Sequence, residues 1–187
     1  MENDGRNSNT NHSSNFQFSF FNFQLYICVV SILPIVTGAS TPVLRTKTKR
    51  VPNITKEILR LIVSMAETMV AAKGAGLAAP QVNRTERVCI AMIDKKLTAL
   101  INPIITWKSE AIEVAEEGCL SLPEIWLQIP RSVEIIVTFL SPEGKKMELK
   151  LEHFNARVVQ HEVDHLDGKL IVDYAQSRAE GHHEKPL

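Results

Sequence analysis

The sequence predicts an α+β fold in which a largely antiparallel β-sheet packs around a C-terminal helix, with an amphipathic helix nearer the N-terminus. Two segments, 52–74 and 154–166, have helical patterning, and the chain between them holds apolar or alternating runs that are typical of strands. At 187 residues and 44% hydrophobic content, the chain suits one domain with its own core.

The first helix is expected within 52–74, where apolar residues recur at steps of three and four and therefore share one face. The residues of this face are Ile58, Leu61, Ile62, Met65 and Met69. Asn53 or Thr55 can cap the start of the helix, and Gly74 suits the position just past its end.

Strands are expected after this helix, at 88–93, 98–101, 132–140 and 145–151. The first run contains Cys89, which we interpret as a buried core thiol. The second strand is expected to stop at Asn102 and Pro103, and the last two are expected to form a hairpin around a turn at 141–144.

The amino-acid composition argues against nucleic-acid binding and against a disulfide-stabilised fold. The 21 basic and 21 acidic residues leave no net charge, so the basic face that nucleic-acid binding needs is not expected. Three cysteines are too few, and odd in number, for a disulfide framework. We therefore expect a cytoplasmic protein without nucleic-acid partners.

Residues 1–30 differ from the rest, because five of the seven phenylalanines fall between Phe16 and Phe23. Polar residues interrupt this apolar run, and no basic start precedes it, so neither a membrane span nor a secretory signal is expected. We expect 1–30 to be a disordered extension or the product of a start assigned too early. The domain itself is expected over 31–175, followed by a polar tail over 176–187.

The helix predicted at 154–166 contains His161, Glu162 and His165 in the pattern His-Glu-x-x-His. Residues four apart share a helix face, so both imidazoles can reach one metal ion with the carboxylate beside them. A catalytic site of this kind usually has three protein ligands. In metzincin proteases the third is a histidine six residues after the second, but Ile171 stands there.

Cys119 is a candidate for the missing ligand, since a divalent metal readily converts a thiol into a thiolate. Taken alone, this cysteine is more typical of a buried structural thiol. The glycine-rich stretch at 74–81 can bring backbone close to a ligand, or it can simply end a helix and make a turn.

Three motifs in this order resemble the peptide deformylase family. They read GAGLAAPQ at 74–81, EGCLS at 117–121 and HEVDH at 161–165, and the resemblance spans roughly residues 31–175. It implies a metal-dependent hydrolase that removes the formyl group from the N-terminal formyl-methionine of new polypeptides, through attack by a metal-bound hydroxide.

The resemblance also implies a role for each motif residue. Cys119, His161 and His165 would hold the metal, and Glu162 would shuttle protons. Gln81 and the backbone N–H of Leu120 would stabilise the oxyanion. The residues implied in binding the peptide are Gly74, Ala75, Gly76, Leu77 and Glu117.

One divalent ion per chain is expected, commonly ferrous iron in this family, with zinc, nickel or cobalt able to take the same ligands. The expected partners are formyl-methionyl nascent peptides and, transiently, the ribosome, without a membrane. Arg131 and Asp164 are candidates to steady the ligand helix. Ala75 and Trp126 depart from common family patterns, which bears on the peptide preference.

Two other functions remain open from the sequence. One is a zincin-type metallopeptidase, which shares His-Glu-x-x-His and peptide substrates but against which Ile171 argues. The other is a non-catalytic relative that only binds peptides, which the five intact positions Gln81, Cys119, His161, Glu162 and His165 do not favour.

Overall fold

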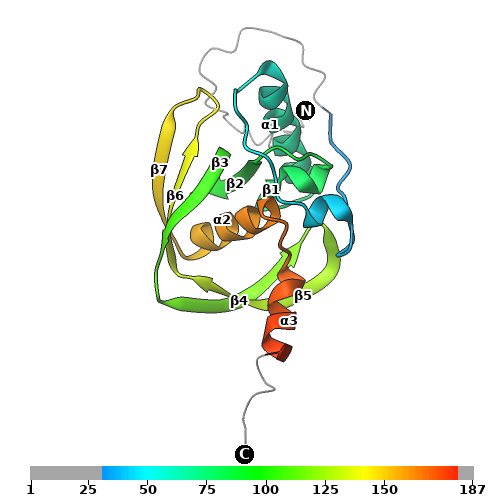
Figure 1. Ribbon diagram of the computed structural model, residues 1–187, viewed down its shortest axis with the longest axis vertical. Coiled ribbons are helices and arrows are strands. Elements are labelled where there is room, and N and C mark those ends of the chain that lie inside the picture. The colour runs from blue at the N-terminus through cyan, green and yellow to red at the C-terminus, as the bar shows by residue number, and fades with distance from the viewer. Residues whose placement is uncertain (1–30, 181–187) are drawn as a thin grey trace, which may run out of the picture.

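The structure, a computed structural model, describes residues 31–180, so the predictions for 1–30 and 181–187 lie outside it. Two antiparallel sheets surround a central helix, α2 (Figure 1). The larger sheet has the order β1-β2-β3-β6-β7, formed by Gly76–Ala78, Val88–Ile93, Lys96–Lys108, Glu134–Leu140 and Lys146–Glu152. The smaller sheet pairs β4 (Ile112–Cys119) with β5 (Leu122–Ser132). The helices are α1 (Lys56–Ala71), α2 (His153–Leu166) and α3 (Ile171–Glu180), with 3-10 turns η1 (Pro42–Arg45) and η2 (Ala79–Val82).

Helices cover both faces of the larger sheet, which explains why β2 is apolar at nearly every position. Val88 and Ile90 belong to the buried cluster on the α1 side. Cys89 and Ala91 point the other way, into the cluster that packs against α2. Cys89 is fully buried, so its interpretation as a core thiol is confirmed.

The amphipathic pattern of 52–74 corresponds to α1. Ile58, Leu61, Ile62, Met65 and Met69, the residues of the apolar face, are all buried. The Thr55 side chain accepts a hydrogen bond from the backbone N–H of Ile58 and so caps the first turn.

The expectation that a strand ends at Asn102 and Pro103 is wrong, because β3 continues to Lys108. The register with β6 shifts between Ile101 and Ile104, and Asn102 takes a left-handed conformation with a φ of 55°. Its side chain exchanges two 2.8 Å hydrogen bonds with the backbone of Val51. A bulge of this kind accommodates the proline, which has no N–H to give to a ladder.

The polar tail predicted from residue 176 begins within α3, which runs from Ile171 to Glu180. The start of α3 is anchored by the buried side chains of Leu170 and Ile171. Arg45 forms an ion pair with Asp173 at 2.7 Å. Once packing has fixed the first turn, further helical residues add at little cost, whatever their polarity.

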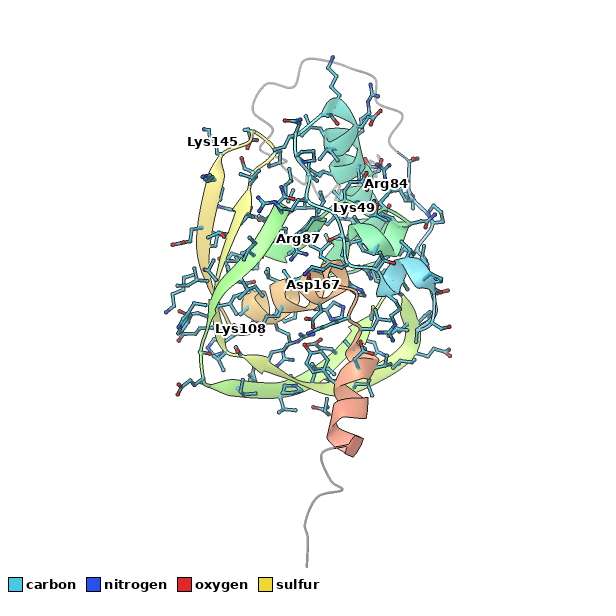
Figure 2. All side chains as sticks on the ribbon, in the orientation of Figure 1. Lys49, Arg84, Arg87, Lys108, Lys145 and Asp167 are labelled. Carbon is cyan, nitrogen blue, oxygen red and sulfur yellow. The ribbon has the colours of Figure 1, made fainter. Side chains whose placement is uncertain are left out.

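Figure 2 labels six charged side chains, and two of them, Arg87 and Asp167, form an ion pair at the end of α2. Arg87 donates to Asp167 at 2.8 Å, where α2 ends. Lys108 and Lys145 lie at sheet ends away from this pair (Figure 2).

Within residues 31–180, no helix combines the length and apolar content required to cross a membrane. The two antiparallel sheets and the helices packed on them confirm the predicted mixture of helices with antiparallel strands.

Gly168 provides a test of how α2 is held in place. Its φ is +75°, and a Cβ there would lie 2.7 Å from the carbonyl oxygen of Arg45. We expect Gly168→Ala to lower the free energy of unfolding by about 2–4 kcal/mol, from left-handed strain plus this clash. Gly144 is the matched control, because it has a φ of +78° but ordinary contacts only. In urea denaturation Gly144→Ala should cost about 1 kcal/mol, and equal costs for both variants would contradict the packing argument.

Candidate active site

Helix α2 places three of the predicted site residues in the middle of the fold. Glu162 and His165 are 3% and 1% exposed, and the side chain of His161 is 12% exposed. Their neighbours Val158, Val159, Val163 and Leu166 are buried in the cluster beneath the larger sheet. This apolar packing fixes the helix, and the ring centroids of the two histidines then lie 5.0 Å apart.

Cys119 comes from the other sheet, at the hairpin that joins β4 to β5. The pairing of these strands shifts between Gly118 and Cys119, and Cys119 then opposes Leu122 across a two-residue turn. The shift turns the thiol toward α2, where Sγ lies 3.2 Å from Nε2 of His165.

The predicted ligands therefore lie together: Sγ of Cys119 and one ring nitrogen each of His161 and His165 fall within 4.8 Å of one another. Within residues 31–180, Oε2 of Glu162 is buried without a hydrogen-bond partner. A thiolate and two imidazoles suit a divalent transition metal, and an unpartnered carboxylate oxygen suits a water or substrate atom beside it. The residues present thus fit a metal centre.

Gly76 is required where the edge of the larger sheet meets this centre. A Cβ added to Gly76 would clash with the carboxylate of Glu162. The glycine in the stretch at 74–81 therefore allows strand β1 to approach the helix that holds the ligands.

The two ends of the Gln81 amide contact different segments of the site. Its Oε1 accepts a hydrogen bond from the backbone N–H of Ala78 at 2.8 Å, which fixes the orientation of the amide. Its Nε2 then lies 3.3 Å from Oγ of Ser121 and 3.8 Å from Sγ of Cys119. An amide donor thus faces the thiol, and Leu120, whose backbone N–H is the other predicted donor, follows Cys119 in the turn.

Glu117 lines the cavity, but its carboxylate is engaged by other protein groups. Oε2 lies 2.9 Å from Nδ1 of His161. Arg131 donates to both oxygens at 3.0 Å, and Arg157 donates to Oε1 at 2.7 Å. The sequence groups Glu117 with the peptide-binding residues, whereas its contacts here orient a predicted metal ligand.

The pKa values reflect burial and these contacts. Burial raises the pKa of Glu162 to about 7, only partly opposed by the nearby His161. Burial disfavours the charged form of Glu117, but hydrogen bonds from His161 and Arg131 outweigh it and lower its pKa to about 2. Burial likewise opposes the imidazolium of His161, yet hydrogen bonds to Cys119 and Glu117 raise its pKa to about 10. A metal ion would therefore compete with a proton for this ring.

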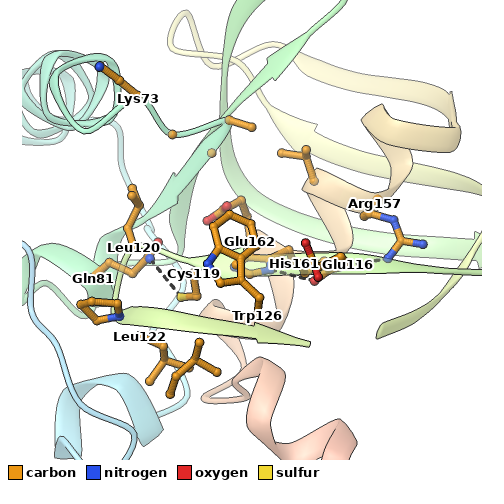
Figure 3. A pocket seen from close by; sticks show the side chains of 18 of the residues that line it. Lys73, Gln81, Glu116, Cys119, Leu120, Leu122, Trp126, Arg157, His161 and Glu162 are labelled. Atoms are coloured by element: carbon orange, nitrogen blue, oxygen red, sulfur yellow. Dashed lines mark hydrogen bonds and ion pairs between the residues drawn. The ribbon is translucent and has the colours of Figure 1, made fainter. Parts of the chain in front are cut away.

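A cavity of about 560 Å³ opens onto these groups (Figure 3). Gln81 of η2, Cys119 of β4, and His161 and Glu162 of α2 all line it. Apolar side chains form much of the remaining wall: Leu120, Leu122, Pro123, Ile125, Trp126, Phe154 and Val158. Such a mixture of apolar wall and a few polar groups is typical of ligand sites.

Some site residues were not identified from the sequence. Arg157 stands four residues before His161, on the same helix face, and a charged residue inside an apolar stretch could have revealed it. Ser121 lies in the EGCLS motif, which by itself indicates no role for its hydroxyl. Ile171, which occupies the place of a metzincin ligand, is 2% exposed within the apolar cluster and offers no donor.

Comparisons with known proteins place similar proteins in one family. The model of the polypeptide deformylase family matches residues 32–180. A curated peptide deformylase of Pseudothermotoga lettingae is 45% identical over 136 residues, which cover 73% of this chain and 79% of the relative.

Solved structures are also similar. The peptide deformylase of Thermotoga maritima matches with a TM-score of 0.74 at 42% identity, over 77% of this chain and 97% of that one. A class I type b peptide deformylase of Acinetobacter baumannii, solved with Met-Ala-Ser bound, matches with a TM-score of 0.75 at 31% identity, over 78% and 99%. The family match and these relatives confirm the resemblance to peptide deformylases, and the chain belongs to the peptide deformylase family.

Proposed function

We propose that the chain removes the formyl group from the N-terminal formyl-methionine of newly synthesised polypeptides. The observation that supports this most strongly is the meeting of Cys119, His161 and His165 beside the buried carboxylate of Glu162. The bound Met-Ala-Ser of the Acinetobacter baumannii relative has the sequence expected of a deformylated product, which adds support. We place the reaction in the cytoplasm, where nascent chains emerge, with transient ribosome association as part of the proposal.

Cys119, His161 and His165 would hold one divalent ion, for which we propose Fe²⁺, with Zn²⁺, Ni²⁺ or Co²⁺ able to replace it. Such an ion lowers the pKa of water to near 7 and polarises a carbonyl oxygen. Glu117 keeps the His161 ring in place, since a proton on Nδ1 donated to its carboxylate leaves Nε2 free as a ligand.

The peptide would bind along β1 as an added strand. β1 is the last strand on its side of the larger sheet, and Gly74, Ala75 and Gly76 line the cavity. Backbone pairing at a sheet edge suits an extended peptide of varied sequence, while the apolar wall takes the methionine side chain.

Glu162 would move the proton. A water molecule gives its hydroxyl to the formyl carbon and its proton to Glu162, which passes a proton to the departing α-amine as the C–N bond breaks. The products are formate and a free N-terminus. The Gln81 amide and the backbone N–H of Leu120 would donate to the oxygen of the formyl group as it gains negative charge.

The first test is turnover of formyl-Met-Ala-Ser by protein purified anaerobically, with the metal content measured on the same sample. Glu162→Gln keeps the shape of the side chain but cannot accept the proton, so kcat should fall by about 10²-fold or more. The metal should remain bound, because Glu162 is not among the three converging donors. Wild-type protein with stoichiometric metal and no turnover would contradict the proposed reaction.

The pH profile offers a second test. The carboxylate form of Glu162 is the base, and it is lost as the pH falls through its pKa, so kcat/KM should decline on the acid side. Without a metal this pKa is about 7, and a nearby cation favours the charged carboxylate. We therefore expect the acid limb below pH 7, and a kcat/KM that still rises between pH 8 and 10 would contradict this assignment.

Gly76→Ala tests the close approach of β1 to the proton-transfer residue. The added methyl group would displace the Glu162 carboxylate, which it would otherwise overlap. We expect kcat to fall by about 10²-fold, as for a small misplacement of a catalytic group, with the metal content unchanged. Gly144→Ala, in the distant turn, should retain wild-type activity, and equal activity of both variants would contradict the argument.

A further inference from the structure

Tyr174 lies outside all three motifs, on α3, yet its hydroxyl reaches the ligand helix. It donates to Oδ2 of Asp164 at 2.7 Å and accepts from Nη1 of Arg131 at 2.9 Å. The guanidinium of Arg131 also lies 4.8 Å from the centre of the tyrosine ring. Asp164 precedes the predicted ligand His165 directly, so α3 is tied to α2 at the metal centre.

The same Arg131 guanidinium is also connected, through Glu117, to the other predicted ligand, His161. The Nη1 group of Arg131 contacts Asp164 and Tyr174, while Nε and Nη2 both donate to Glu117. Glu117 in turn contacts Nδ1 of His161. Arg131 and Glu117 are only 4% and 6% exposed, so water cannot readily replace a lost partner.

We propose that Tyr174 is a positioning residue for the metal centre: its hydroxyl holds Arg131 and Asp164 in the arrangement that keeps Glu117 on His161. The proposal rests on the proposed function only for its catalytic readout, because the geometry of the ligands can be measured without substrate.

The Tyr174 hydroxyl affects the orientation of the Arg131 guanidinium more than the strength of its ion pairs. A guanidinium is planar, so fixing Nη1 also fixes the direction in which Nε and Nη2 point. If the hydroxyl is removed, Arg131 can rotate toward Asp164, and its paired contact with Glu117 loosens. His161 then loses the partner that fixes its ring, which is the kind of change that costs about 10–100-fold in metal affinity or activity.

Tyr174→Phe tests this directly, because it keeps the ring beneath Arg131 and removes only the hydroxyl. With Co²⁺ as the bound ion, we expect release to a chelator to be about tenfold faster and the visible absorption bands of the ion to shift. With formyl-Met-Ala-Ser, kcat should fall by a similar factor while KM stays unchanged, since the peptide edge is not altered.

Thr68→Val is the matched control. The Thr68 hydroxyl is buried and, like that of Tyr174, accepts one hydrogen bond, from the N–H of Leu33, and donates one, to the carbonyl of Ser64. It lies on α1, apart from the ligand network. Its loss should lower stability but leave the release rate and the spectrum of Co²⁺ as in the wild type.

Asp164→Asn completes a double-mutant cycle with Tyr174→Phe. If the hydroxyl acts through Asp164 and Arg131, the double variant should release Co²⁺ no faster than the faster single variant. Release rates that multiply would overturn the proposal, as would a Tyr174→Phe protein that matches Thr68→Val in release and spectrum. If Tyr174→Phe does not fold, Asp164→Asn alone decides, and a wild-type release rate in that variant overturns the proposal.

These readouts separate the two hypotheses. A wild-type protein that binds Co²⁺ but does not deformylate the peptide would contradict the proposed function and leave the Tyr174 measurements valid. An active wild type with an unchanged Tyr174→Phe variant would contradict the positioning role alone.

Discussion

The site depends on one buried carboxylate, that of Glu117. A buried negative charge is tolerated only when it is paired and hydrogen-bonded, and here two guanidiniums and an imidazole supply the partners. Arg131 comes from β5, whereas Arg157 and His161 come from α2. The charge therefore joins the small sheet to the ligand helix, and Cys119 at the end of that sheet is brought to the histidines.

The motif residues of the site were predictable from the sequence, but the hairpin that carries the second motif, at 117–121, was not. Along β4 the usual pattern is inverted: Ile112 and Val114 are exposed, while Glu117 is buried. Alternation of apolar and polar residues indicates which face is buried only when that face is apolar. Here the buried Glu117 is ionic, so the sequence pattern points to the wrong side. The pairing of this carboxylate with Arg131, Arg157 and His161 explains its burial.

Helices α1 and α2 were predictable because local features define them. α1 has an apolar stripe and a cap, and a glycine follows the end of α2. Tyr174 shows the opposite case. Its partners stand 10 and 43 positions away in the chain, and no local pattern distinguishes it from an ordinary helical tyrosine. The extension of β3 past Pro103 likewise depends on Asn102 meeting Val51, a contact between distant segments.

The two edge strands of the larger sheet, β7 and β1, differ in how they avoid pairing with strands of other molecules. β7 presents alternating charges, Lys146, Glu148, Lys150 and Glu152, which discourage edge-to-edge association. β1 cannot rely on charge if it is to accept a peptide backbone. It is only three residues long, and Pro80 follows in η2. An edge this short offers too few hydrogen bonds to recruit another sheet, so the same brevity that suits the end of a polypeptide also protects the protein from aggregation.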